Sequence, residues 1–490
     1  MTTPGTDDLL DPLGLRSDAP LLDGYLTYLE TEVTPLHTPG HKTRTQRMGP
    51  VLQGDVTLYG GVDTIRGSHK LLEAAEAKAA LLWGGDWCRF SVAGSTHANQ
   101  ALSLGVANPG DTVVVSRMLH RSLLLGLVLA GLKPVWVTPD VDPHVGLPVG
   151  VRAERVAAAL ERNPAAKAVF LVDPSYVGTV SHIEDHAEVA HAFGIPLIVD
   201  QAWGGHFGFH PDVPPHALEL GADAMVTSVH KALTGYTQSA LVVARAQRFD
   251  LDRLERAFDA THTTSPAGQI VGSIDATRAL LARDGRELLG ETVRICNLGR
   301  DRLRGVPGLQ VVDASVLPPG TRFDPTKIVL GVAGTGVDGV QLDDDLSEVG
   351  YPIEYSDRDT VVATLSIFDG EVDVLGFVDA FANALTRRRG EGSGRARTVR
   401  PHVAWTVEPE TVIRPRDAFF AVHETVSAED AVGRVSAEIV APYPPGVPVL
   451  APGERVTAAT MQALHDVKAD GAMVRYAADP SLATLQVVVE

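Results

Sequence analysis

The sequence predicts an α/β protein with a large, mostly parallel sheet, followed by smaller C-terminal α/β units. Between Lys70 and Ala240, short apolar runs alternate with segments of helical periodicity, which is typical of a buried parallel sheet covered by helices. The chain has 490 residues, more than one hydrophobic core accommodates, so we expect two or three domains.

In the large unit, strands and helices are expected to alternate along the chain. The strands are expected at residues 89–92, 111–115, 134–137, 168–172, 196–200 and 224–228. The helices are expected at residues 71–83, 98–107, 122–130, 151–162, 183–193 and 269 to 304. Polar residues follow several of these strands, and ligands of open α/β sheets bind beyond the carboxyl ends of the strands. We therefore expect the functional site at that edge.

A second α/β unit is expected after the long helix, with strands at residues 309–312, 327–332 and 360–367 and a helix at 372–386. The run from Arg387 to Arg397 is basic, glycine-rich and poor in apolar residues, which predicts an exposed linker. The expected division is an N-terminal arm (1–45), a large cofactor domain (46–306), a small α/β domain (307–388), a linker (389–398) and a C-terminal domain (399–490).

Composition excludes several classes of function. The net charge of −19 argues against a nucleic-acid partner and would attract cationic small molecules, although solubility alone also explains it. The two cysteines, Cys88 and Cys296, fall in no metal-ligand pattern, so we expect neither a metal site nor disulfides. The sequence shows no signal-peptide pattern and no apolar run long enough for a membrane, which predicts a cytoplasmic protein.

The strongest local motif is Ser228-Val229-His230-Lys231, at the exit of the strand that begins at Ala224. A lysine among small and polar residues at a strand end is poorly placed for a solvated role, and a buried amine is costly unless it is paired or covalently used. Lysine condenses with carbonyl groups to give a Schiff base. The alternative is a structural lysine with satisfied partners.

Asp200 ends another apolar strand and is followed by Gln201, Ala202 and Trp203. A carboxylate at this position can keep a pyridine nitrogen protonated, or it can simply cap a loop. The small Ala202 would let a ring lie flat. Trp203 can donate its indole N–H to a phenolic oxygen of that ring, or it can pack in the core.

Gly94-Ser95-Thr96 opens an expected helix, where free backbone N–H groups and two hydroxyls suit a phosphate, although such residues also cap helices. His120 follows the strand at 111–115 and can stack on a cofactor ring or have a structural role. Each signal is weak alone. Together they place an anion site, a carboxylate, a histidine and a lysine at strand ends of one sheet, which predicts a pyridoxal phosphate site.

With other motifs, this pattern resembles the prokaryotic Orn/Lys/Arg decarboxylases. The other motifs are His37-Thr38-Pro39-Gly40-His41-Lys42, Pro174-Ser175-Tyr176-Val177-Gly178, Thr237-Gln238-Ser239-Ala240, Thr263-Thr264-Ser265-Pro266, Pro442-Tyr443-Pro444-Pro445-Gly446-Val447-Pro448 and Ala451-Pro452-Gly453-Glu454. The resemblance implies a fold type I, aspartate aminotransferase-like enzyme of the shorter type, without the family's N-terminal regulatory domain. It implies decarboxylation of arginine, lysine or ornithine to the amine and CO₂, as in polyamine metabolism.

The resemblance also implies roles for single residues. Lys231 would hold the cofactor as a Schiff base, Asp200 would bind its ring nitrogen, and His120 would stack on the ring opposite Ala202. The phosphate would be held by Ser95, Thr96, Ser228 and His230, and Gly94 would also lie at the cofactor. Thr264 would approach the cofactor of a partner subunit, so we expect a homodimer or an assembly of dimers.

For the substrate we expect an anchoring carboxylate, because a charge-assisted pair fixes the far end of a cationic side chain. Glu454 is the candidate, since the Pro/Gly-rich segment before it can project a side chain into a site; the alternative is a surface loop. His41 is the second expected substrate-binding residue. The chain departs from the family at Gln201, often an acidic residue or serine, and at residues 58–65.

Two other functions remain open. An aminotransferase, aldolase or amine-forming oxidase could use the same fold, although no single arginine stands out to bind a substrate carboxylate. A non-catalytic cofactor-binding paralogue is the other alternative, and the intact Lys231, Asp200 and His120 argue against it.

Overall fold

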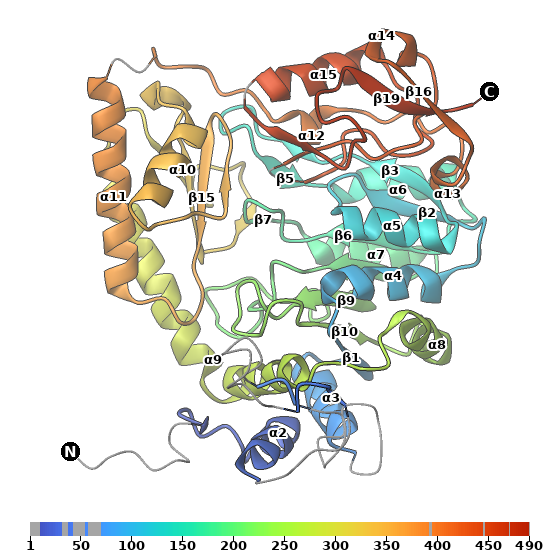
Figure 1. Ribbon diagram of the computed structural model, residues 1–490, viewed down its shortest axis with the longest axis vertical. Coiled ribbons are helices and arrows are strands. Elements are labelled where there is room, and N and C mark those ends of the chain that lie inside the picture. The colour runs from blue at the N-terminus through green and yellow to red at the C-terminus, as the bar shows by residue number, and fades with distance from the viewer. Residues whose placement is uncertain are drawn as a thin grey trace.

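The computed structural model describes residues 10–31, 38–42, 54–56, 70–391, 394–443, 446–469 and 471–489. Figure 1 shows three groups of elements: a large unit around a seven-stranded sheet, a small unit that ends in α11, and a C-terminal unit that lies against the large one. In the described ranges no helix is both long and apolar enough to cross a membrane.

The large sheet has the strand order β1-β10-β9-β8-β6-β2-β3. Its strands are Trp87–Ser91 (β1), Thr112–Ser116 (β2), Lys133–Val137 (β3), Val169–Val172 (β6), Leu197–Asp200 (β8), Ala224–Ser228 (β9) and Ala240–Ala244 (β10). Only β10 of these strands runs against the others, since it pairs antiparallel with both β1 and β9. The mostly parallel sheet predicted from the sequence is confirmed, and β10 is the strand that the prediction missed.

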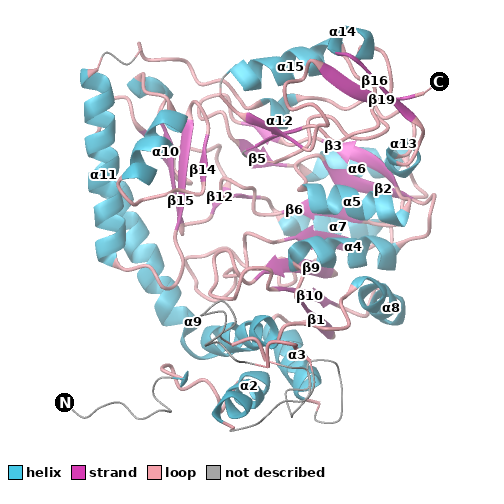
Figure 2. Ribbon diagram, viewed as in Figure 1, coloured by secondary structure: helices cyan, strands magenta, loops and turns pink. Residues whose placement is uncertain are grey.

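Helices cover both faces of this sheet (Figure 2). They are α3 (Leu71–Leu82), α4 (Gly94–Val106), α5 (Arg121–Ala130), α6 (Ala153–Arg162), α7 (Ile183–Ala192) and α8 (Leu251–Thr261). Alternate strand residues face opposite cores: Val113 and Val115 pack with α4, α5 and α8, whereas Val114 packs in the core with α3, α6 and α7. Burial on both faces explains the continuous apolar runs in the sequence.

The small unit begins in the long helix α9 (Gly268–Leu303), which contacts α2 (Pro20–Glu30) and α3 at one end and α11 (Glu371–Gly390) at the other. Its four-stranded antiparallel sheet has the order β11-β13-β15-β14. The elements are Gln310–Val312 (β11), Lys327–Gly331 (β13), Tyr355–Ser356 (β14), Thr360–Thr364 (β15), a short 3-10 helix (Ala333–Thr335) and α10 (Gly339–Glu348). Figure 1 shows α10 and α11 beside this sheet.

The C-terminal unit packs on α5 of the large unit, where Arg416 donates to the carbonyls of Val128 and Leu129 over 3.2 and 2.8 Å. Its elements are α12 (Val403–Thr406), α13 (Pro415–Phe419), β16 (His423–Ser427), α14 (Ala428–Ala431), β17 (Ala441–Tyr443), α15 (Ala458–Ala469), β18 (Met473–Arg475) and β19 (Thr484–Val488). Four short strands, Asp140–Val141 (β4), Pro148–Gly150 (β5), Thr179–Val180 (β7) and Arg322–Phe323 (β12), form small ribbons between the units.

The basic run expected to be an exposed linker is partly helical and partly bound. Helix α11 continues through its arginines to Gly390, where basic side chains favour a helix C-terminus. Arg388 makes a bidentate hydrogen bond to the carboxylate of Asp345 over 2.8 and 2.6 Å, and Arg397 donates to Asp359 over 3.1 Å. The start of the run is therefore helical rather than a linker, whereas residues 394–396 are irregular and exposed as expected, and Arg397 is bound to the small unit. The domain boundaries themselves stay a prediction.

Candidate active site

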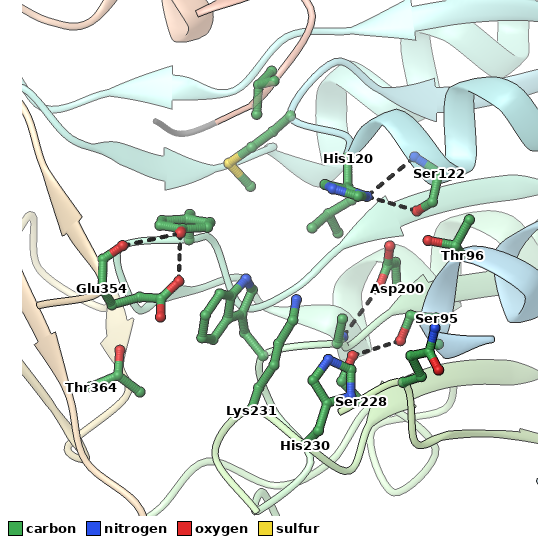
Figure 3. Close-up of a pocket in the computed structure, with 18 of the residues that line it drawn as sticks. Ser95, Thr96, His120, Ser122, Asp200, Ser228, His230, Lys231, Glu354 and Thr364 are labelled. Atoms are coloured by element: carbon green, nitrogen blue, oxygen red, sulfur yellow. Dashed lines mark hydrogen bonds between the residues drawn. The ribbon is translucent and has the colours of Figure 1, made fainter. Parts of the chain in front are cut away.

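A pocket of about 640 Å³ lies where the sequence predicted it, at the carboxyl ends of β6, β8 and β9 and the first turn of α4. Figure 3 shows its side chains pointing toward a common space. The small unit adds Glu354 and Thr364, and the C-terminal unit adds Trp405, Tyr443 and Val447. All three units therefore contribute to one site.

The start of α4 forms one end of the pocket. No side-chain hydrogen bond caps this helix, although the N–H of Gly94 already donates to the carbonyl oxygen of Gln238 over 2.8 Å. The N–H groups of Ser95 and Thr96, which follow it, are placed to bind a ligand anion. Gly94 has φ +70°, a left-handed conformation that other residues rarely adopt, and this sharp turn presents Ser95 and Thr96 to the pocket. The hydroxyls of Ser95 and Ser228 are hydrogen-bonded at 2.8 Å, which brings the expected phosphate residues of β9 and α4 together.

His230 lies at the same end of the pocket. Its Nδ1 donates to the carbonyl oxygen of Ser239 over 2.8 Å, which fixes the orientation of the ring. Burial lowers the pKa of His230. At neutral pH the ring is therefore a neutral group with a fixed geometry.

Asp200 is held rigidly at the end of β8 and is 5% exposed. One carboxylate oxygen accepts from the backbone N–H of Ala202 over 3.1 Å, and the other accepts from the side-chain amide of Asn99 over 2.7 Å. Asn99 is a site residue that the sequence analysis missed. A carboxylate held by two donors on a rigid strand end is suited to a fixed ring nitrogen.

His120 lies across the pocket, immediately before α5, and its ring nitrogen Nδ1 is hydrogen-bonded to Ser122. Figure 3 shows His120, Asp200 and Lys231 around the same space. Burial lowers the pKa of His120, and the positive charges of Lys231 and Arg121 lower it further. The negative charge of Asp200 acts in the opposite direction.

The amine of Lys231 lies 4.2 Å from the centre of the Trp203 ring. Burial lowers the pKa of Lys231 to about 8, and the charge of Lys327 adds to this, while Asp200 and Glu354 oppose it. A lowered pKa increases the fraction of neutral amine, the form that attacks a carbonyl carbon. Trp203 and Lys231 both line the pocket, and Trp203 packs against the Lys231 amine rather than in a closed core; their roles toward the cofactor stay predictions.

Together these features fit pyridoxal phosphate. The uncapped helix start suits its phosphate, Asp200 suits its ring nitrogen, and Lys231 suits its carbonyl carbon. The fixed positions of these groups around one cavity are the structural reason for the fit.

The predicted substrate carboxylate Glu454 is not in this pocket. It is 2% exposed and forms a buried ion pair with Arg117, with Nη2 and Oε2 separated by 3.0 Å. The same oxygen accepts from the backbone N–H of Ala451 over 2.8 Å. Arg117 lies just beyond β2, and its guanidinium is the ion-pair partner of the Glu454 carboxylate. Glu454 therefore joins the C-terminal unit to the sheet. Glu454 does not line the pocket of this chain, and its expected role as substrate anchor stays a prediction that this ion pair does not support.

Glu354, from the small unit, is a carboxylate that does lie on the pocket wall. It accepts a hydrogen bond from the hydroxyl of Tyr176 over 2.7 Å, and Figure 3 shows it on the opposite side of Lys231 from Asp200. Among the described lining residues, Asp200 and Glu354 are the carboxylates. The only sequence signal was an acidic residue before a short strand, and nothing local to it indicates that it faces Lys231.

Three further expectations fall outside the pocket. His41 bonds to Asp55 over 2.9 Å, and Thr264 is exposed on the loop before α9; neither lines the pocket of this chain. Gln201 is buried and accepts from the backbone N–H of Ala217 over 3.1 Å, so this departure from the family pattern is structural. The departure at residues 58–65, as well as His37 and residues 444–445, lies outside the described residues.

A family model described as Orn/Lys/Arg decarboxylase, major domain, matches residues 19–319, and that of the family's C-terminal domain matches residues 400–471. The chain belongs to the Orn/Lys/Arg decarboxylase family. It is a decarboxylase of basic amino acids, in a family that depends on pyridoxal phosphate. The family resemblance and the activity class predicted from the sequence are thereby confirmed.

Named relatives cover nearly the whole chain. An arginine decarboxylase of Halalkalibacterium halodurans is 31% identical, covering 97% of this chain and 98% of that protein. An arginine decarboxylase of Bacillus subtilis is 29% identical, covering 97% of this chain and 99% of that protein.

Solved structures support the fold. The constitutive lysine decarboxylase of Escherichia coli matches with a TM-score of 0.79 at 20% identity, covering 99% of this chain and 83% of that chain. The lysine decarboxylase of Francisella novicida gives the same TM-score at 17% identity, covering 96% of this chain and 81% of that chain. The fold type I architecture is thereby confirmed.

Proposed function

We propose that the substrate is arginine, which the protein converts to agmatine and CO₂. The observation that carries this proposal is Glu354, a carboxylate on the pocket wall across Lys231 from Asp200. A guanidinium binds a carboxylate through two parallel hydrogen bonds, which fix both distance and orientation. The arginine decarboxylases of similar length support the same choice.

Each residue of the site has a defined role in this proposal. Lys231 binds the cofactor covalently, and the helix start at Ser95 and Thr96 binds its phosphate. When bound, pyridoxal phosphate supplies an electron sink for the bond that breaks at the substrate Cα. Asp200 keeps the proton on the ring nitrogen, and the packing of Trp203 against Lys231 keeps water away from the amine.

Loss of CO₂ rather than transfer of an amino group requires that the Cα–carboxylate bond be held perpendicular to the ring. Glu354 provides this by fixing the far end of the substrate. The described lining of the pocket contains no arginine that would hold the substrate carboxylate in the way an aminotransferase requires. The alternative reactions on the same fold therefore have less support.

The proposal is tested by measuring CO₂ release from arginine, lysine and ornithine at equal concentrations. We expect kcat/KM to be highest for arginine. A higher value for lysine or ornithine would overturn the substrate assignment and leave the family activity intact. A second measurement, the identity of the amine product, separates decarboxylation from deamination of the same substrate.

We also propose that the active form is a homodimer or an assembly of dimers. Thr264 is exposed and lies outside its own chain's pocket, so the phosphate role implied by the family pattern requires a second copy. We expect light scattering to give a mass of at least twice 52.0 kDa for the active species. An active species at the monomer mass would contradict the proposal. The cytoplasmic location also stays a prediction.

A further inference from the structure

Asn99, on α4, links two residues of the pocket through its side chain. It is 2% exposed, and its Nδ2 lies 2.7 Å from a carboxylate oxygen of Asp200 and 3.0 Å from the hydroxyl oxygen of Ser122. A carboxylate only accepts hydrogen bonds, so the amide presents its NH₂ group here and both hydrogens are used. Asn99 therefore donates to Asp200 and Ser122 at the same time.

The hydrogen bonds continue from Ser122 to His120. The Ser122 hydroxyl, which already accepts from Asn99, lies 2.9 Å from Nδ1 of His120, and the backbone N–H of Ser122 is 3.2 Å from the same nitrogen (Figure 3). A backbone N–H only donates, so Nδ1 of His120 is an acceptor. The proton of the neutral ring is then on Nε2.

We propose that Asn99 and Ser122 are positioning residues that hold His120 as a neutral imidazole with its proton on Nε2. The inference rests on the proposed function, because it gives a role to a histidine that would stack on the cofactor. A second proton on Nδ1 would point at the backbone N–H of Ser122, where two hydrogens would face each other. It would also take the place of the hydrogen that the Ser122 hydroxyl donates to Nδ1. The same amide also donates to Asp200, so one side chain helps to orient both His120 and the carboxylate that would hold the ring nitrogen of the cofactor.

The charges that face His120 favour the same state. Lys231 and Arg121 are positive and disfavour an imidazolium, while Asp200 alone among the neighbouring charges favours it. A neutral ring donates a hydrogen bond from Nε2 without adding a cation next to Lys231. His120 therefore acts in this site as a hydrogen-bond donor and not as a cationic acid.

The tautomer can be measured by nitrogen NMR of protein labelled with ¹⁵N-histidine, with and without pyridoxal phosphate. The His120 signal is the one lost in His120→Gln. In the wild type we expect a neutral ring with its proton on Nε2 at pH 7. In Ser122→Ala the pKa of His120 should rise by roughly 0.5 to 1 unit, because a hydrogen bond that favours the neutral ring is lost. Ser122→Thr keeps a hydroxyl and should restore the wild-type value.

Asn99→Ala should also raise the pKa of His120, by less than Ser122→Ala, and should change the pH dependence of the bound-cofactor absorbance through Asp200. Ser103→Ala is the matched control. Ser103 is buried on the same helix and donates to the backbone carbonyl of Asn99 over 2.8 Å. Its loss therefore perturbs α4 but not the side-chain hydrogen bonds that run from Asn99 through Ser122 to His120. We expect wild-type titration of His120 in this control.

Any of three results would overturn the inference: a proton on Nδ1 of His120, an imidazolium at pH 7, or an unchanged pKa of His120 in Ser122→Ala. The NMR measurement does not depend on turnover. The protein could also show a neutral His120 with its proton on Nε2 and yet release no CO₂ from basic amino acids. That result would refute the proposed function but not the inference about Asn99, Ser122 and His120.

Discussion

The two walls of the pocket are built in different ways. On one wall, Asp200 ends β8 and Lys231 lies in the loop just after β9, and the parallel arrangement of these two strands brings their carboxyl ends to one edge of the sheet. The opposite wall takes Glu354 from the small unit and Tyr443 from the C-terminal unit, which meet only when the units pack. The first wall is specified by local sequence, and the second by long-range packing. Substitutions on the two walls should therefore affect different steps.

The largest effect is expected on the sheet wall, for Lys231→Ala. Without the amine no covalent bond to the cofactor forms, so the absorbance of the lysine-bound cofactor should disappear. Turnover should fall by at least about 10³-fold, the order lost when a covalent catalytic group is removed. The exposed Lys167→Ala is the control. A Lys231 variant that keeps both absorbance and turnover would refute the assignment of this wall to the cofactor.

Asp200→Asn should have the next largest effect. The amide cannot keep the ring nitrogen protonated, which weakens the electron sink, although the other contacts to the cofactor remain. We expect cofactor binding to persist while kcat falls by about 10²-fold or more. Equilibrium dialysis and steady-state kinetics measure the two quantities. Near-normal turnover would exclude Asp200 from this role.

On the opposite wall, Glu354→Gln should raise KM and leave the cofactor absorbance unchanged. Loss of a charge-assisted pair costs about 1.5 to 3 kcal/mol, which corresponds to a KM for arginine roughly 10- to 100-fold higher. Glu348→Gln, an exposed carboxylate on α10 of the same unit, is the control and should behave as wild type. If both variants bind arginine equally well, the far end of the substrate is held elsewhere.

Glu454→Gln provides the contrasting case. This change leaves the buried Arg117 without its charged partner, so we expect the free energy of unfolding to fall by about 3 kcal/mol. The KM for arginine should stay within about twofold of wild type, because Glu454 lies outside the pocket. Denaturant unfolding and kinetics on the same preparation test both statements. A large rise in the KM for arginine with unchanged stability would support Glu454 as the substrate anchor instead of Glu354.

The same contrast explains what the sequence could predict. Lys231, Asp200 and Ser95 each follow an apolar run, so strand periodicity and side-chain chemistry were enough to bring them together. The sequence around Glu354 and Glu454 carries no such signal, and their partners distinguish them: Tyr176 for Glu354 and Arg117 for Glu454. The arginines in the last turn of α11 misled in a similar way, because the composition of this run resembles a linker, whereas Arg388 is helical and binds Asp345.

The smallest effect concerns the pH dependence of the rate at which Lys231 of the cofactor-free protein reacts with pyridoxal phosphate. It depends on both walls, because a residue of the small unit acts on the lysine of the sheet wall. The neutral amine of Lys231 is the reacting form, and its pKa is lowered to about 8. The capture rate should therefore rise about tenfold per pH unit below pH 8 and level off above it. Lys327, buried on β13 with its amine 4.2 Å from the centre of the same Trp203 ring, contributes a like charge to this shift.

Removing that charge in Lys327→Met should raise the pKa of Lys231, so the midpoint of the capture curve should move to higher pH by roughly 0.5 unit. Stopped-flow absorbance after mixing with the cofactor gives the midpoint directly. Thr364→Val is a useful comparison, because it removes the hydroxyl that lies 3.1 Å from the Lys327 amine but keeps the charge. A midpoint that is unchanged in Lys327→Met would mean that burial alone sets the pKa of Lys231, and that the small unit does not tune the lysine on the sheet wall.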